Sequence, residues 1–264
     1  MTLAQVRAPA VAGTFYPGTR RELEAAVRGY LGQSEARTGH VPKALIVPHA
    51  GYVYSGPIAA SAYALLSPAR EWIERVVLLG PAHRVFVGGL AAPDAVSFAT
   101  PLGEVPIDRD ALARVAGLPQ VSLRPDAHAP EHSLEVHLPF LQIALAEFSL
   151  VPLVVGDASG EEVAEVLEVL WGGRETLIVV SSDLSHYESY ATARRMDAAT
   201  TRAIEALRPE DIRRDDACGR VPIQGLLLAA RSHGLSPRTL DVRNSGDTAG
   251  PRDAVVGYGA WAFA

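Results

Sequence analysis

Short runs rich in Val, Ile and Leu alternate along the chain with longer segments of helical periodicity. Four of these runs, at 43–48, 75–80, 150–155 and 176–181, end in or just before Pro, Gly or Ser. An apolar run of this length, bounded by turn residues, is typical of a buried strand. A fifth run, at 253–263, predicts a closing strand.

Helices are predicted in the segments between these strands. Apolar spacing or helix-start signals mark the segments 19–31, 55–66, 108–115, 130–148, 160–171, 190–206 and 221–233. Asp108 is expected to cap the third of them. Pro139 should kink or restart the longest one. Residues 85–99 predict two short strands with a turn at Pro93-Asp94 between them.

The order of these elements predicts an α/β fold. Strands that alternate with helices favour a central, mostly parallel or mixed sheet with helices on both faces. No internal repeat, low-complexity tract or linker interrupts the 264 residues. We therefore expect a single domain over residues 1–264, long enough to bury a large core.

Composition narrows the class of protein. The chain is 48% hydrophobic and 20% charged, with a net charge of -6, which indicates a globular protein without a nucleic-acid footprint. No apolar stretch reaches the roughly 18–20 residues of a membrane helix, and no charged and apolar leader opens the sequence. The single cysteine excludes an intramolecular disulfide. We expect a cytoplasmic protein that binds neither nucleic acid nor membrane.

Three histidines follow the predicted strands at the point where an apolar run turns polar. They are His49, His83 and His186. Ligands of an open α/β sheet bind beyond the carboxyl ends of its strands, so this placement predicts a metal or acid–base site. Glycines at 51 and 56 near His49 allow close approach of a bound group. The alternative is a structural histidine that is hydrogen-bonded at a strand end.

Cys218 precedes a predicted apolar helix. The positive end of the helix dipole favours a thiolate there. Two imidazoles and a thiolate would form a three-ligand metal site with open positions for water or substrate. The alternative is a small buried apolar residue, which is the commoner state of an isolated cysteine.

Asp183 and His186 lie three residues apart just past a strand. This spacing suits a carboxylate that orients an imidazole acting as general acid or base. The alternative is that Asp183 caps a helix and His186 faces solvent.

The segment 131–137 contains Glu131, His132, Glu135 and His137 without a zinc-protease motif. We expect His132 to line the site and Glu135 to contact the residues that line it. Glu131 is interpreted as a complement to the helix dipole, and His137 receives no role.

Several motifs in order along the chain resemble the Memo family, called AmmeMemoRadiSam system protein B in prokaryotes. They are Pro-Ala-Val-Ala-Gly-Thr-Phe-Tyr-Pro at 9–17, Pro-His-Ala-Gly-Tyr-Val-Tyr-Ser-Gly at 48–56, Gly-Pro-Ala-His at 80–83, Glu-His-Ser-Leu-Glu-Val-His-Leu-Pro-Phe-Leu-Gln at 131–142, Ser-Ser-Asp-Leu-Ser-His-Tyr at 181–187, Cys-Gly at 218–219 and Gly-Asp-Thr-Ala-Gly at 246–250. The resemblance spans nearly the whole chain.

This resemblance implies the fold of the class III extradiol dioxygenases, which open catechol rings with non-haem Fe(II). It implies that His49, His83 and Cys218 are metal ligands, that His186 and His132 occupy acid–base positions, and that Asp183 lies beside them. Those dioxygenases hold iron with two histidines and a carboxylate. The softer thiolate of Cys218 shifts the preference toward iron of another redox range, copper or zinc.

We therefore expect a metalloprotein that binds Fe(II), with copper or zinc as alternatives, and acts as a dioxygenase-like oxidoreductase on a small phenolic substrate. One alternative is a non-catalytic module that binds a peptide or small-molecule ligand, and another is a zinc-dependent hydrolase. The family's prokaryotic name implies a radical-SAM enzyme and an AmmeCR-type protein as partners.

Overall fold

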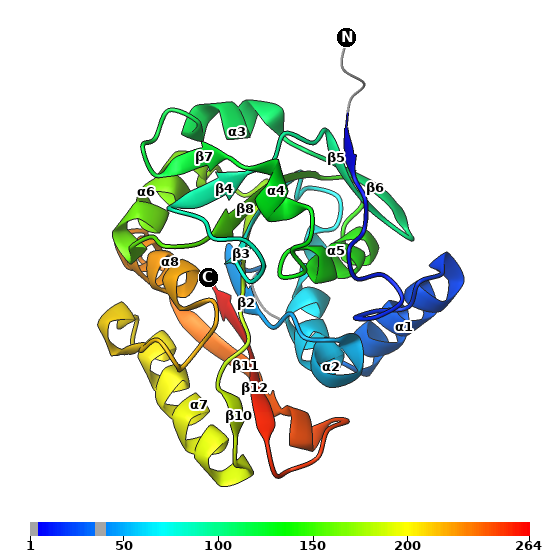
Figure 1. The fold of residues 1–264 in the computed structure, drawn as a ribbon, viewed down its shortest axis with the longest axis vertical. Coiled ribbons are helices and arrows are strands. Elements are labelled where there is room, and N and C mark those ends of the chain that lie inside the picture. The colour runs from blue at the N-terminus through cyan, green and yellow to red at the C-terminus, as the bar shows by residue number, and fades with distance from the viewer. Residues whose placement is uncertain (1–4, 35–40) are drawn as a thin grey trace.

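Figure 1 shows the computed structural model, which describes residues 5–34 and 41–264. The other positions of the predicted domain, 1–4 and 35–40, lie outside the described residues. Within the described part, nine strands form one sheet in the order β10-β12-β2-β9-β3-β8-β4-β7, with β11 paired to β12. These strands are β2 (Ala44–Val47), β3 (Arg75–Pro81), β4 (Leu90–Ala92), β7 (Val121–Leu123), β8 (Ser149–Val155), β9 (Thr176–Ser181), β10 (His186–Glu188), β11 (Pro237–Asn244) and β12 (Val255–Phe263).

The sheet is mixed, with a parallel centre. Strands β2, β9, β3 and β8 run parallel to one another. Antiparallel strands flank them: β12 pairs with β2, and β4 pairs with β8. The predicted α/β class with a mostly parallel or mixed sheet is therefore confirmed.

Alternate residues of the central strands enter two separate cores, one on each face of the sheet. On one face Leu45 and Leu78 pack with the first group of helices, and on the other face Ile46 and Val77 pack with the second group. The first group is α1 (Arg20–Gln33), α2 (Tyr52–Tyr63) and α5 (Leu138–Ala144). The second is α3 (Arg109–Val115), α6 (Gly160–Leu170), α7 (Tyr190–Glu205) and α8 (Arg220–Ser232). Figure 1 shows the two groups on opposite sides of the central strands.

A small second sheet joins β1 (Val6–Arg7), β5 (Ser97–Thr100) and β6 (Gly103–Pro106). The two strands predicted within 85–99 correspond to β4 and β5, which lie in different sheets, so the residues at 93–94 connect two sheets. The remaining short helices are α4 (Pro125–His128), η1 (Ala64–Ala69), η2 (Glu135–His137), η3 (Pro209–Asp211) and η4 (Ser245–Asp247).

The predicted cap at Asp108 is confirmed, since its carboxylate accepts from the Ala111 amide at 2.8 Å. The prediction of one long helix over 130–148 is wrong. Residues 131–134 are irregular, and helical structure begins with η2 and continues in α5, whose first turn contains Pro139. The Glu131 carboxylate accepts from the amides of His132 and Ser133, which offers the backbone an alternative to a helix.

No helix in residues 5–34 or 41–264 combines the length and the apolar character needed to cross a membrane.

Candidate metal centre

Two of the histidines predicted for the site, His49 and His83, lie at the carboxyl edge of the parallel strands. His49 follows β2, and His83 follows β3. Strand β9 lies between these two strands and pairs with both, and Asp183 follows it. Because adjacent parallel strands end at the same edge of a sheet, residues more than a hundred positions apart meet there.

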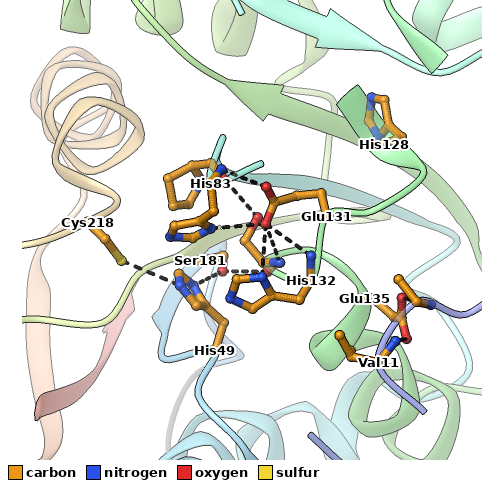
Figure 2. A network of polar contacts seen from close by, with 12 residues as sticks. Val11, His49, His83, His128, Glu131, His132, Glu135, Ser181 and Cys218 are labelled. Carbon is orange, nitrogen blue, oxygen red and sulfur yellow. Dashed lines mark hydrogen bonds and ion pairs between the residues drawn. The ribbon is translucent and has the colours of Figure 1, made fainter. Parts of the chain in front are cut away.

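Three histidines form a cluster at this edge. The ring nitrogens that His49, His83 and His132 offer lie within 4.8 Å of one another. The ring centroids of His83 and His132 are 4.7 Å apart, and those of His49 and His83 are 5.1 Å apart (Figure 2). His49 is buried, His132 is half-buried and His83 is exposed. Burial lowers the pKa of His132 to about 4, so the imidazole carries no charge near neutral pH. Such a cluster is compatible with metal binding.

Hydrogen bonds set the orientation of His49. Its Nδ1 lies 2.6 Å from the Ser181 hydroxyl, and that hydroxyl donates to the Ser133 carbonyl at 2.6 Å. Since the hydroxyl donates its proton to that carbonyl, the Ser181 oxygen is the acceptor of a hydrogen bond from the Nδ1–H of His49. The lone pair on Nε2 is left available to a metal, which is the orientation that metal-bound histidines adopt.

A buried carboxylate orients His83. Glu131 accepts from His83 Nδ1 at 3.0 Å and from the His83 amide at 2.7 Å (Figure 2). The amides of His132 and Ser133 also donate to it, each at 3.0 Å. Burial raises the pKa of Glu131, but the hydrogen bonds from His83 and Ser133 outweigh this and hold it at about 2. The interpretation of Glu131 as a complement to a helix dipole is wrong, because no helix begins there.

Cys218 approaches the cluster from the loop before α8. Its sulfur lies 3.4 Å from His49 Nε2, close to the roughly 3.5 Å that separates a sulfur and a nitrogen ligand of one tetrahedral metal. Burial raises the pKa of this thiol to about 12. The two imidazoles and the thiol are donor types that iron, copper and zinc all accept. The group of donor atoms that lie within 4.8 Å of one another consists of His49, His83 and His132, and the Cys218 sulfur adjoins it at His49.

Asp183 supports the Cys218–His49 contact. Its carboxylate accepts from the His49 amide at 2.8 Å, and its own amide donates to the Cys218 sulfur at 3.3 Å. Burial raises the pKa of this carboxyl to about 7. Among the described contacts none joins Asp183 to His186, which is exposed and whose Nδ1 bonds the Leu184 carbonyl at 2.7 Å.

Glu135 lies outside the cluster and serves the N-terminal segment. It forms an ion pair with Arg7 and accepts from the Ala10 amide at 2.7 Å and the Val11 amide at 3.0 Å. Figure 2 shows Glu135 and Val11 apart from the histidines. The expectation that Glu135 contacts the residues lining the site is therefore wrong.

His137 is also remote from the cluster. It is buried, and its Nδ1 is 2.8 Å from the Tyr63 hydroxyl.

Comparison with known proteins gives a consistent result. A family model described as "Memo-like protein" matches residues 7–262. A "MEMO1 family protein" of Aeropyrum pernix is 39% identical, with 97% of this chain and 99% of that protein covered. Another from Aquifex aeolicus is 38% identical, with 96% and 97% covered. A third from Nitrosopumilus maritimus is 33% identical, with 98% and 99% covered.

Proposed function

The chain belongs to the Memo family, and we propose that it is an iron-binding protein that performs redox chemistry on a small phenolic substrate. The observation that carries the proposal is the histidine cluster, in which the ring nitrogens lie within 4.8 Å of one another. His49 and His83 each have one ring nitrogen committed to a hydrogen bond and the other available for a metal.

We assign His49, His83 and Cys218 as the ligands. The 3.4 Å between Cys218 sulfur and His49 Nε2 supports this set. A thiolate together with imidazoles suits Fe(II), and copper and zinc remain the competing metals. When bound, the metal supplies Lewis-acid and redox chemistry.

His132 is the proposed base within the site. Its Nδ1 is buried, makes no hydrogen bond among the described residues, and lies 3.3 Å from the Glu131 carboxylate. The ring packs against Phe15, with centroids 4.8 Å apart, and against His83. This packing holds the imidazole in place to accept a proton from a substrate hydroxyl. His186, exposed to solvent, is proposed to pass protons between the site and water.

Anaerobic loading with Fe(II), followed by metal analysis, tests the proposal. We expect about one iron per chain in the wild type and a loss of most of it in His49→Gln and Cys218→Ser. His233→Gln is the matched control, because His233 lies on the surface against Glu168. Undiminished iron in Cys218→Ser would remove the cysteine from the ligand set.

Oxygen consumption by the loaded protein across a panel of phenols and catechols then tests the chemistry. Full iron without oxygen consumption on any member of the panel would contradict the redox function and leave the metal site standing. A preference for zinc over iron in competition would contradict the choice of metal.

A further inference from the structure

A groove with a cavity volume of about 530 Å³ adjoins the metal centre. Its walls come from the residues that precede and follow His83, the loop after β8, and the segment that leads into α8. Cys218 is one of the lining residues, and so is Ala82, the residue before His83. The groove therefore reaches one proposed metal ligand, Cys218, and the residue next to another, His83.

Two arginines line this groove and have no carboxylate partner in the described part of the chain. Arg214 makes no side-chain hydrogen bond there, and Arg220 contacts only Gln224, at 3.3 Å. Asp157 is the one carboxylate among the lining residues. The nearby Asp216 carboxylate accepts from the Arg213 amide. In a chain with a net charge of -6, two unpaired guanidinium groups beside one groove leave it locally positive.

Apolar side chains form another part of the lining. Val85 and Phe86 lie along the groove, and Phe86 is 76% exposed. An exposed phenylalanine next to a cavity gives an aromatic or aliphatic body something to pack against. The groove thus combines an apolar wall with two fork-shaped donors, and guanidinium groups bind planar or tetrahedral oxyanions in a bidentate way.

We propose that this groove binds the oxyanion group of an organic ligand, with Arg214 and Arg220 as the recognition residues. The body of the ligand extends along Phe86 toward Cys218. Carboxylates and phosphate monoesters share this chemistry. The inference that the other end of the ligand reacts at the metal rests on the proposed function. Binding of the oxyanion does not require the metal.

Calorimetric titration with matched probes tests the site. The probes are 4-hydroxybenzoate, its neutral counterpart 4-hydroxybenzamide, and inorganic phosphate. The variants are Arg214→Gln and Arg220→Gln, with Arg238→Gln, exposed on β11, as the control. We expect the benzoate to bind more tightly than the amide and to weaken about tenfold in each groove variant, as the loss of a charged hydrogen bond predicts. Arg238→Gln should bind it like the wild type.

Competition identifies the source of the oxyanion. Displacement of the benzoate by phosphate at lower concentrations would name a phosphate ester, and displacement only by other acids would name a carboxylate. Either result supports the site. Equal binding of benzoate and benzamide, unchanged binding in Arg214→Gln, or no saturable binding of benzoate or phosphate up to about 10 mM would overturn it.

Iron content separates this proposal from the function proposed above. Arg214→Gln changes an exposed side chain that contacts no proposed ligand, so its iron content should equal that of the wild type. If iron fails to bind but the arginine-dependent binding of benzoate persists, the metal function falls and the oxyanion site remains.

Discussion

At the scale of single residues, two side chains that are not proposed metal ligands orient the imidazole rings of His49 and His83. The Ser181 hydroxyl accepts a hydrogen bond from His49 Nδ1, and the Glu131 carboxylate accepts one from His83 Nδ1. The second nitrogen of each ring is thereby left as an acceptor. Neither role was predicted. Glu131 adjoins His132 in sequence, but the partner that matters, His83, lies 48 positions away, and local spacing carries no information on that contact.

Replacing Glu131 with glutamine should weaken metal binding about 10- to 100-fold, the usual cost of losing a hydrogen-bonded partner of a ligand. Glutamine has one acceptor oxygen, and its amide group meets the donors of His83 with a donor of its own. Titration of Fe(II) against a competing chelator measures the change. Glu147→Gln, on an exposed side chain, is the control. Equal affinity in the two variants would show that Glu131 does not orient His83.

At the scale of elements, the sequence predicted the central strands and most helices because burial on both faces leaves long apolar runs. The prediction failed where hydrogen bonds from side chains set the backbone conformation. The segment 131–137 has helical spacing, but Glu131 caps its own following amides and Pro139 delays the regular helix. The antiparallel strands β10 and β11 were also not predicted, since most of their residues are exposed or half-buried and no continuous apolar run marks them.

The same segment holds the N-terminal strand through the Glu135–Arg7 ion pair. Both side chains are buried, and Arg7 also donates to the carbonyls of His128 at 3.1 Å and Glu131 at 2.6 Å. Glu135→Gln leaves the guanidinium without its counter-charge, so we expect the free energy of unfolding to fall by about 3 kcal/mol.

Urea denaturation measures this loss. Glu24→Gln provides the comparison, because Glu24 pairs with Arg28 on the surface and such a pair contributes about 0.5 kcal/mol or less. A loss in Glu135→Gln as small as that in Glu24→Gln would mean that the charge of the Glu135–Arg7 pair contributes little to holding the N-terminal segment.

At the scale of the whole molecule, the carboxyl edge of the sheet could be predicted as the location of the site, because apolar runs and the residues after them are visible in the sequence. His132 and Cys218 were candidates for the site, but their contacts with the other residues could not be predicted. Both lie on irregular loops far along the chain, and no periodicity describes where such a loop lies in the fold. The structure shows the contact between the Cys218 sulfur and His49.

Buried histidines away from the metal centre should make the stability of the whole protein depend on pH. Burial lowers the pKa of His128 to about 4 and that of His137 to about 3, both below the ordinary value near 6.5. The unfolded chain therefore binds more protons than the folded one, so stability is lost as pH falls below about 6.5. Asp197 opposes this, since burial raises its pKa to about 6 and its contribution is lost as pH rises from about 4 to 6.

His128→Gln isolates one contribution. Glutamine can keep the donor that His128 Nε2 provides to the Ala91 carbonyl at 2.9 Å, but it does not titrate. We expect the wild type to lose up to about 1.4 kcal/mol more per pH unit than the variant between pH 6 and 4.5. Urea unfolding at half-unit steps measures the two curves, and their difference at pH 8, where both side chains are neutral, gives the reference. Curves that stay parallel down to pH 4.5 would mean that His128 takes up its proton as readily in the folded protein as in the unfolded chain.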